Sequence, residues 1–359
     1  MIKVAFKIIL FHFFYYFGFP KIKPLNLVIS LTNSCNSRCQ TCNIWKQENK
    51  QKLTLDELNK IFANIGQGPY EIILTGGEPF LRDEIVKICQ SVVKHIKPKV
   101  IIIPTNGLLT EVIVDKVQQI LEKCPKTKLV VNISLDEIGE ANDKIRGIAG
   151  AFLKATETYQ KLRAIKNKNF NLNIHTVISR FNVKKIPEIY QFVQEKFKPD
   201  SYITEIAEKR VELDTVDSEI TPLAEEYSQA IDFLIPKIKE EKFHKLSKIT
   251  QMFRIQYYQI VKKILKNNKR VIPCYAGIAS VQITPNGQVW NCCIKGQALG
   301  DLRSVDYNFK KIWQSRKASQ VRKEIKNTKC FCPLANASYT NMLMHSPTLT
   351  KVVKNLIFK

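Results

Sequence analysis

Three cysteines in one short stretch constrain this chain more than any other feature of its sequence. Cys35, Cys39 and Cys42 have the spacing C-x3-C-x2-C, and the apolar run 27–31 before them is typical of a buried strand. Thiolates this close together can all turn toward one metal centre, and they suit iron–sulfur or zinc ligation. Three such ligands would leave one iron of a four-iron cluster free to bind a molecule that reacts.

Zinc and disulfide bonds are the alternatives for these cysteines. A structural zinc site normally takes a fourth Cys or His close by, and the residues directly after Cys42 supply none. Disulfides suit an oxidising compartment, whereas no secretory cleavage site follows the apolar first residues. Ten cysteines, seven of them in three tight groups, favour metal chemistry in a reducing compartment.

The order of apolar and polar segments predicts an α/β fold. Strand patterns alternate with helical patterns, and a capping box at Thr54 predicts the first helix after the cysteine loop. We expect a partial (β/α)6 TIM-type barrel, followed by a small C-terminal Cys-rich extension of a β-hairpin and a helix. The expected barrel strands cover residues 27–31, 71–75, 100–103, 129–135, 171–178 and 202–206.

The segment Gly76-Gly77-Glu78-Pro79 follows the second expected strand. Paired glycines permit a positive φ and let a ligand approach the backbone closely, although a plain tight loop is their commoner meaning. One strand after the cysteine triplet, the segment resembles a motif of the radical S-adenosylmethionine (radical SAM) superfamily. The resemblance implies a [4Fe–4S] cluster on the three cysteines, whose open iron binds the methionine portion of S-adenosylmethionine (SAM).

Other polar residues at the strand ends fit the same resemblance. Ser134 and Asp136 alternate along one strand and should point to one face, where they would suit the ribose of SAM; an Asp that caps the next loop is the alternative. Asn106 would also suit a plain turn. The SAM-binding residues that the resemblance implies are Gly76, Gly77, Glu78, Asn106, Ser134, Asp136, Ser179 and Asn182.

Four further residues have open roles. Thr41 stands where the superfamily often has an aromatic residue that packs near adenine, so Trp45 is a candidate replacement. Arg146 can pair with an anionic substrate or the SAM carboxylate, and a solvent-facing arginine is the alternative. We expect His175, in the middle of a strand, to be a hydrogen-bonded core residue rather than a ligand.

A second group of cysteines follows later in the chain. The turn Pro285-Asn286-Gly287 joins two strand patterns into a hairpin, which brings Cys274 and Cys292 together. Their spacing, C-x12-G-x4-C, resembles the SPASM extension of radical SAM enzymes in its shorter, one-cluster twitch form. The resemblance implies a second iron–sulfur cluster, with a zinc ribbon as the alternative. Its expected ligands are Cys274, Cys292, Cys330 and Cys332, with Cys293 as a replacement ligand or a spare thiol.

The chain is strongly basic, with 56 Lys and Arg against 32 Asp and Glu, a formal net charge of +24. Such a surface favours anionic partners, and a general excess of lysine is the alternative. The apolar N-terminus is too short and too interrupted for a secure membrane span. It predicts either an interfacial helix or a helix that closes the base of the barrel. In the interfacial case the residues facing lipid and its headgroups would be Phe11, Phe13, Phe14, Tyr15, Lys3 and Lys7.

These patterns divide the chain into five segments. We expect an apolar N-terminal segment (1–23), a radical SAM core (24–208), a basic helical connector (209–270), an auxiliary-cluster region (271–335) and a basic amphipathic tail (336–359). In the connector, Pro236 should lie in the first turn of a helix that runs to Arg270. Cys89 and Cys124 should be small buried residues on helices.

The resemblance implies an enzyme that cleaves SAM reductively to a 5′-deoxyadenosyl radical, which takes hydrogen from a peptide, a protein or a lipid- or sugar-linked substrate. It also implies an electron donor such as flavodoxin or ferredoxin. We expect a cytoplasmic protein, peripheral on the inner face of an acidic membrane if the chain ends bind lipid, and no nucleic-acid partner. The alternative is a non-enzymatic zinc or iron–sulfur protein that binds nucleic acid or membrane.

Overall fold

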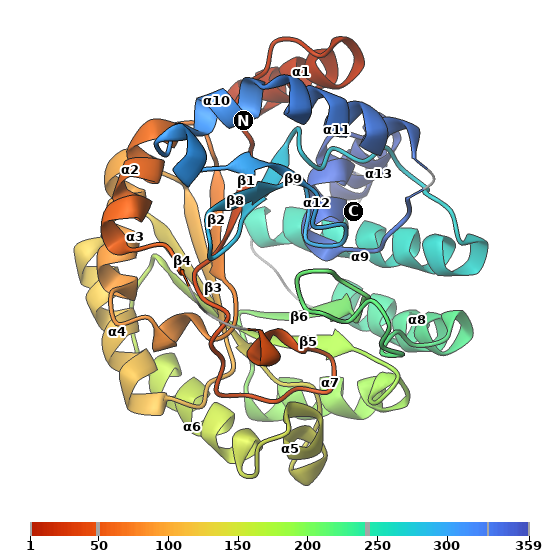
Figure 1. The fold of residues 1–359 in the computed structure, drawn as a ribbon. Helices are drawn as coiled ribbons and strands as arrows, with labels where there is room; N and C mark the ends of the chain where they lie inside the picture. Colours follow the sequence, from red (N-terminus) through yellow and green to blue (C-terminus); the bar gives the residue numbers. More distant parts are fainter. Residues whose placement is uncertain (1, 48–50, 241–244, 329, 358–359) are drawn as a thin grey trace.

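The computed structural model describes residues 2–47, 51–240, 245–328 and 330–357. Within them the strands form one sheet in the order β6-β5-β4-β3-β2-β1-β7-β8-β9. The strands are β1 Asn26–Ser30, β2 Glu71–Thr75, β3 Val100–Thr105, β4 Lys128–Ser134, β5 Phe170–Ile178, β6 Ser201–Ile206, β7 Ser280–Ile283, β8 Gln288–Trp290 and β9 Ala298–Asp301. β1 to β6 are parallel and curve into an unclosed barrel (Figure 1), which confirms the expected partial (β/α)6 architecture.

Helices alternate with the barrel strands and cover their outer face (Figure 1). The helices are α1 Ile2–Phe17, α2 Leu55–Ile65, α3 Ile85–His95, α4 Thr110–Lys123, α5 Glu140–Arg146, α6 Ala151–Arg163, α7 Ile186–Lys196, α8 Ala224–Glu240, α9 Lys245–Asn267, α10 Phe309–Gln314, α11 Arg316–Asn327, α12 Ala335–Leu343 and α13 Ser346–Ile357. The capping box predicted at Thr54 is present at the start of α2. Cys89 is buried in α3, and Cys124 is buried at the end of α4, as predicted.

The strands place apolar and polar side chains on opposite faces, because successive side chains of a strand alternate. On β4, for example, Val131 and Ile133 are buried toward the helices, whereas Asn132 and Ser134 line a cavity inside the barrel. His175 on β5 also lines this cavity and is only partly buried, so its prediction as a core residue was wrong. The barrel interior is therefore polar enough to hold a ligand.

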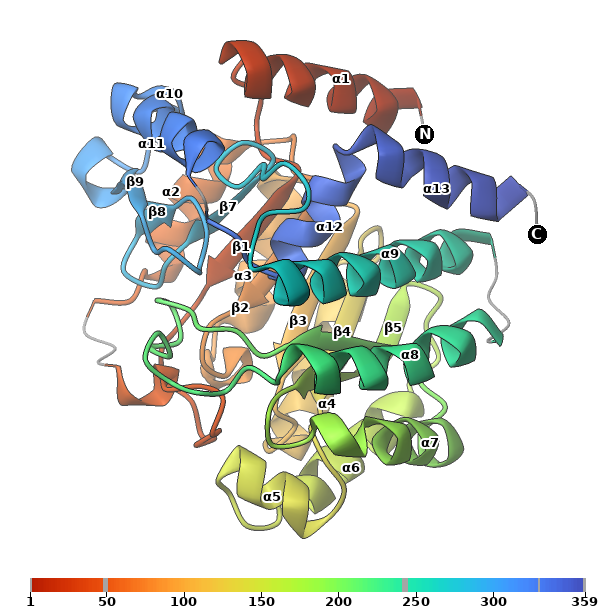
Figure 2. The same cartoon turned by 90° about the vertical axis from the view of Figure 1, so that its right-hand side faces the viewer.

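The C-terminal region continues the barrel sheet instead of forming a separate body. β7 pairs in parallel with β1, from Asn26 opposite Ser280 to Ile29 opposite Ile283. β7 and β8 form the predicted hairpin, and β9 adds a third antiparallel strand that the sequence did not predict. α12 packs against α9 and α13 (Figure 2).

The connector differs from its prediction. Pro236 lies inside α8 rather than at the start of a helix. A proline inside a helix has no N–H to bond the carbonyl four residues earlier, so α8 lacks one of its regular hydrogen bonds there. α9 then packs Tyr258, Val261 and Ile264 into the core, which agrees with the amphipathic pattern.

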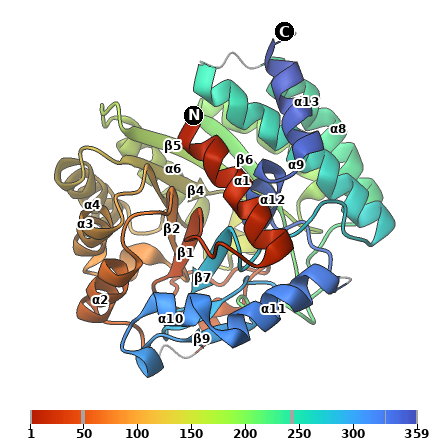
Figure 3. The same cartoon turned by 90° about the horizontal axis from the view of Figure 1, so that it is seen from above.

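The N-terminal helix α1 lies at the amino end of the barrel strands, because it leads directly into β1 (Figures 2 and 3). Phe11 and Phe14 are buried against the protein, so their predicted contact with lipid was wrong, whereas Phe13 is exposed. The side chain of Lys3 lies outside the described residues. No described helix is long and apolar enough to cross a membrane.

Glu57 joins the barrel to the C-terminal region. Its carboxylate closes the capping box with Thr54 and also accepts hydrogen bonds from Arg303, at 2.6 Å and 3.1 Å, and from Tyr307 at 3.0 Å. Arg303 lowers the pKa of Glu57 from 4.5 to about 2. We expect Glu57→Gln to reduce the free energy of unfolding by about 1 kcal/mol at neutral pH, because glutamine keeps the capping box but loses the charge.

The pH dependence of this effect follows from the lowered pKa. Glu57 contributes stability above its ordinary pKa of 4.5 and loses it as the pH falls through about 2. Urea unfolding should therefore show the difference between the parent and Glu57→Gln shrinking over this interval. Thr54→Ala, which removes only the cap, is the control. A difference for Glu57→Gln that stays constant with pH would contradict the assignment.

Candidate active site at the carboxyl ends of the strands

The loop that carries Cys35, Cys39 and Cys42 leaves the carboxyl end of β1. The segment after β2 holds it by backbone hydrogen bonds, from Gly77 N to Thr32 O at 2.7 Å and from Glu78 N to Ser34 O at 2.9 Å. The two strand ends are in register beneath these bonds, with Ser30 opposite Thr75. The cysteine loop therefore begins in a fixed position relative to the sheet.

Gly76 and Gly77 are required by the close approach of these two backbones. Gly76 has a φ of +121°, and a Cβ atom there would lie 2.3 Å from Thr32 O; a Cβ on Gly77 would lie 2.1 Å from Ser34 O. Both distances are far below van der Waals contact, so no other residue fits without moving the loop. From the sequence we expected a ligand to approach the backbone of these two glycines closely. In the structure, the backbone of the cysteine loop approaches them closely.

The end of α5 holds the loop from the other side. Arg38 N donates to Arg146 O at 2.9 Å, and Gln40 N donates to Ile145 O at 2.8 Å. Gly147 ends α5 with a φ of +66°, and a Cβ atom there would lie 2.4 Å from Arg38 O. The loop is thus clamped between two glycine-containing segments from different parts of the barrel.

Arg146 also turns its side chain toward the cysteines. Its guanidinium lies 3.6 Å from Cys39 Sγ and 3.0 Å from the Asp136 carboxylate, and its side chain is only 12% exposed. The solvent-facing alternative for Arg146 was therefore wrong. A buried arginine with a carboxylate on one side and a thiol on the other places positive charge where a thiolate would form.

The three thiols lie at one end of a cavity of about 700 Å³ inside the barrel. Asn106 Nδ2 lies 3.9 Å from Cys35 Sγ and 2.7 Å from Asn36 Oδ1 in the same loop. Burial raises the pKa of Cys35 to about 11 and that of Cys42 to about 12. The free thiols of Cys35 and Cys42 are therefore protonated at neutral pH, and a metal centre must displace those protons.

The residues expected to bind SAM fall into two groups. One group lines the cavity beside the cysteines and comprises Gly76, Gly77, Glu78, Asn106 and Ser134. The other group is buried within the protein and comprises Asp136, Ser179 and Asn182. Asp136 accepts from Val177 N and pairs with Arg146, while Asn182 Nδ2 donates to Asp136 O at 2.7 Å and its Oδ1 accepts from Ser179 N. This second group supports Arg146 and does not reach the cavity.

Glu78 connects the ends of two strands. Its buried carboxylate accepts hydrogen bonds from Thr105 Oγ1 and Asn106 N, both at 2.8 Å, and from Phe80 N at 3.1 Å. Burial raises the pKa of Glu78 to about 7 despite these bonds. Glu78 thereby fixes Asn106, which in turn touches the cysteine loop.

Trp45 is not placed to replace the missing aromatic residue at Thr41. The Arg38 guanidinium lies over its ring at 4.7 Å, and its Nε1 donates to Cys42 O. Trp45 is absent from the described residues that line the cavity, whereas Thr41 is among them. Trp45 therefore braces the cysteine loop from outside.

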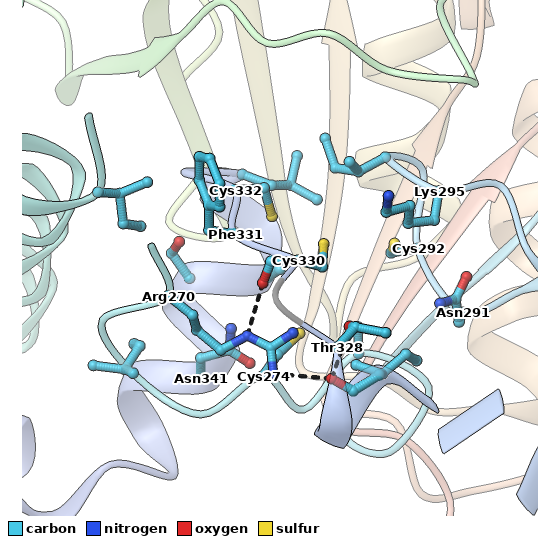
Figure 4. Close-up of a pocket in the computed structure, with 18 of the residues that line it drawn as sticks. Arg270, Cys274, Asn291, Cys292, Lys295, Thr328, Cys330, Phe331, Cys332 and Asn341 are labelled. Carbon is cyan, nitrogen blue, oxygen red and sulfur yellow. Dashed lines mark hydrogen bonds between the residues drawn. The ribbon is translucent and has the colours of Figure 1, made fainter. Parts of the chain in front are cut away.

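A second, smaller cavity of about 110 Å³ lies in the C-terminal region (Figure 4). Cys274, Cys292, Cys330 and Cys332, the four expected ligands, all line it. Arg270 ties two of the segments together, because its Nε donates to Cys330 O at 2.9 Å and its guanidinium also donates to Ile325 O. Asn341 Oδ1 accepts from Tyr275 N at 2.7 Å, which joins α12 to the residue after Cys274.

Each group of cysteines lines a cavity. Cys35, Cys39 and Cys42 line the barrel cavity, and the other four line the smaller one. An iron–sulfur cluster takes each thiolate on a different iron, so its ligands surround a larger volume than a single ion needs. The thiolate donor sets suit such clusters, and the set of four would also suit zinc.

Cys293 differs from the other four cysteines because it does not line the smaller cavity. It is buried against Leu334 and Ala337 and lines the barrel cavity instead of the smaller one. Its neighbour Cys292 lines both cavities. The structure therefore favours the spare-thiol alternative for Cys293.

A charged group at the end of β6 and just beyond it was not predicted from the sequence. Glu205, Glu208, Arg210 and Glu212 all line the barrel cavity. His175 Nε2 and the Arg210 guanidinium lie 3.6 Å and 3.8 Å from Glu205 Oε1. Both Glu208 oxygens are buried without a hydrogen-bond partner among the described residues. Charged residues alternating directly after a strand were the signal that could have revealed this group.

Comparisons with known proteins agree with this geometry. The family model described as "Radical SAM superfamily" matches residues 29–193, and the SPASM model, described as "Iron-sulfur cluster-binding domain", matches residues 274–333. Together the two matches span more than half of the chain. The protein belongs to the radical SAM superfamily, whose enzymes use a [4Fe–4S] cluster and SAM. Within it, the chain carries a SPASM domain after the radical SAM domain, and a SPASM domain implies additional iron–sulfur centres.

Two relatives illustrate the range of similar proteins. The antilisterial bacteriocin subtilosin biosynthesis protein AlbA of Bacillus subtilis is 26% identical over 308 residues, which cover 82% of this chain and 62% of AlbA. This chain thus spans less than two thirds of the length of AlbA. The probable GTP 3′,8-cyclase of Sulfurisphaera tokodaii is 25% identical over 286 residues, which cover 78% of this chain and 84% of that protein.

Solved structures show the same fold. Streptococcus suis SuiB bound to the precursor peptide SuiA superposes with a TM-score of 0.63 at 16% identity, covering 96% of this chain and 77% of that chain. Native anSMEcpe with bound AdoMet and a Cp18Cys peptide gives a TM-score of 0.61 at 15% identity, covering 93% and 98%.

The close backbone contact at Gly77 can be tested by a single substitution. We expect Gly77→Ala to lose roughly half of the iron and sulfide of the reconstituted parent, because the added Cβ displaces the first cysteine loop and leaves the second cavity intact. Iron and sulfide analysis measures this. Gly139→Ala is the control, since Gly139 also lies at positive φ (+59°) but a Cβ there meets nothing within 4 Å. Full iron content in Gly77→Ala would show that the loop tolerates displacement.

Two thiols of the C-terminal region form a matched pair for a test of the second cavity. We expect Cys274→Ser to lose the iron of the second site and to keep that of the first, whereas Cys293→Ser keeps both, because of these two cysteines only Cys274 lines the smaller cavity. Iron content and visible absorbance after anaerobic reconstitution measure both variants. Equal losses from the two variants would contradict this separation.

Proposed function

We propose that Cys35, Cys39 and Cys42 hold the [4Fe–4S] cluster that cleaves SAM, and that the substrate enters the barrel cavity beside it. The observation that carries the proposal is the single cavity of about 700 Å³ that is lined by all three cysteines and by the charged residues after β6. When bound, the cluster and SAM supply a reductive cleavage that yields methionine and a 5′-deoxyadenosyl radical, which takes hydrogen from the substrate.

The residues of the chain would orient this chemistry. Asn106 and Arg146 lie next to two of the thiols and would stabilise their thiolate forms. We assign the contacts with SAM to the cavity-lining segment Gly76–Glu78 and to Asn106 and Ser134. We assign Asp136, Ser179 and Asn182 to the support of Arg146, because their polar atoms bond within the protein. The barrel walls would limit the access of water to the reaction.

We propose that the substrate is a residue of a peptide or protein. AlbA is a biosynthesis protein of the bacteriocin subtilosin, and SuiB and anSMEcpe were each solved with a peptide. The free oxygens of Glu208 support a substrate with hydrogen-bond donors, since a buried carboxylate without a partner is costly. Burial raises the pKa of Glu208 to about 8, so a bound donor would also stabilise its anion.

We assign the second cluster to Cys274, Cys292, Cys330 and Cys332, which surround the smaller cavity. An external reductant such as flavodoxin or ferredoxin would supply the electron for SAM cleavage. We also propose a cytoplasmic location. Ten cysteines that are all free in the structure, seven of them proposed as cluster ligands, suit a reducing compartment.

The central test is the reductive cleavage of SAM. After anaerobic reconstitution, the parent with dithionite and SAM should release 5′-deoxyadenosine, and the Cys35→Ala/Cys39→Ala/Cys42→Ala variant should release none, because no thiol remains to hold the first cluster. Chromatography of the products measures this. The triple variant should keep the iron of the second site. Equal iron content in the parent and the triple variant would overturn the proposed ligands.

The substrate class has a separate test. Extract of the source cells should increase 5′-deoxyadenosine release by the reconstituted enzyme, and prior protease treatment of the extract should abolish the increase. An extract of small molecules that remains fully active after protease treatment would exclude a peptide or protein substrate. It would leave the cleavage of SAM itself untouched.

A further inference from the structure

Helix α1 presents two apolar faces, only one of which is covered. Phe11 and Phe14 are buried, at 0% and 2% exposure, against the protein. The other face is exposed and is formed by Phe6, Ile9, Phe13, Tyr16 and Phe17, with Phe19 just beyond the helix; each is between 49% and 77% exposed. The positions 6, 9, 13, 16 and 17 repeat at helical spacing, so these side chains form one continuous stripe, here called the α1 stripe.

The stripe is exposed although α1 is firmly attached. Lys7 Nζ donates to Gly68 O at 2.7 Å, and the Tyr275 hydroxyl lies 3.0 Å from His12 Nδ1. Tyr15 stacks on Tyr275 with ring centres 4.5 Å apart, and Phe14 packs edge-on against Trp313. These contacts hold the helix by its inner face, so the stripe is a fixed surface and not a frayed end.

Positive charge surrounds the stripe. Residues 1–47 contain no Asp or Glu, and neither do residues 325–359, which include the neighbouring α13 (Figures 2 and 3). Lys326 of α11 lies about 5 Å from the rings of Tyr15 and Tyr16, at 5.1 Å and 5.3 Å. Burial, together with the charge of Lys23, lowers the pKa of Lys7; burial and Lys310 lower that of Lys23. These lysines therefore lie close enough to repel one another.

We infer that the α1 stripe binds the surface of an anionic lipid membrane. Aromatic side chains insert at the level of the headgroups, and lysines beside them attract acidic lipids. A protein partner with an acidic rim would match the charge, but a row of five large apolar side chains, four of them aromatic, on one helix lying flat at the surface is the pattern of an interfacial helix. This inference does not depend on the proposed chemistry, because the stripe is at the opposite end of β1 from the cysteine loop.

Vesicle binding by the full-length reconstituted protein tests the inference. The parent should float with vesicles of phosphatidylglycerol and phosphatidylcholine, should float weakly or not at all with phosphatidylcholine alone, and should lose binding as salt is added. Phe6→Ser/Phe13→Ser/Tyr16→Ser should weaken binding by about tenfold or more, because it removes three exposed aromatic side chains. These side chains are exposed, so the variant should unfold at the temperature of the parent.

Leu153→Ser/Leu223→Ser is the matched control, because these side chains are 71% and 70% exposed but lie outside α1. It should bind vesicles like the parent. Equal binding by the parent and the stripe variant would overturn the inference, and so would equal binding to anionic and neutral vesicles. A parent that ignores vesicles but forms a dimer, which the stripe variant converts to a monomer, would also overturn it and assign the stripe to self-association.

Discussion

The position of the first cysteine loop depends on contact between backbones. The loop is held between the segment after β2 and the end of α5, and Gly76, Gly77 and Gly147 let the chains approach to distances that a Cβ atom would prevent. Backbone contacts of this kind leave little freedom, because no flexible side chain can absorb a displacement. The three thiols therefore depend on residues that are far apart in the sequence and that carry no reactive group.

Around the cysteine loop, buried polar residues hold the side chains that contact the thiols. Glu78 fixes Asn106, and Asp136 fixes Arg146; Asn106 and Arg146 are the side chains that reach the sulfurs. Residues that resemble cofactor ligands in the sequence can thus instead support the side chains that lie nearer to the thiols. The buried positions of Ser179 and Asn182, which bond to each other and to the backbone of Asp136, have the same explanation.

Much of this could be predicted from the sequence. The barrel could be predicted from the alternating strand and helix patterns. Both groups of thiols could be predicted from the cysteine spacings, because residues close together in the sequence must also lie close together in the fold. The role of Gly147 and the burial of Arg146 could not be predicted, since both depend on how α5 returns to the cysteine loop. Pro236 was misplaced because proline is favoured in the first turn of a helix, whereas here it lies inside α8. The two faces of α1 were confused because nearly every residue there is apolar, so periodicity alone could not show which side is covered.

The parallel pairing of β7 with β1 has a consequence for electron transfer. β1 leads into the first cysteine loop, and β7 lies between Cys274 and Cys292 of the second. Both groups of cysteines are therefore tied in part to adjacent strands of one sheet, whose hydrogen bonds would have to break together for the strands to separate. Clusters held by the two groups would keep the same separation from one turnover to the next. An electron that passed between them would then cross a fixed distance.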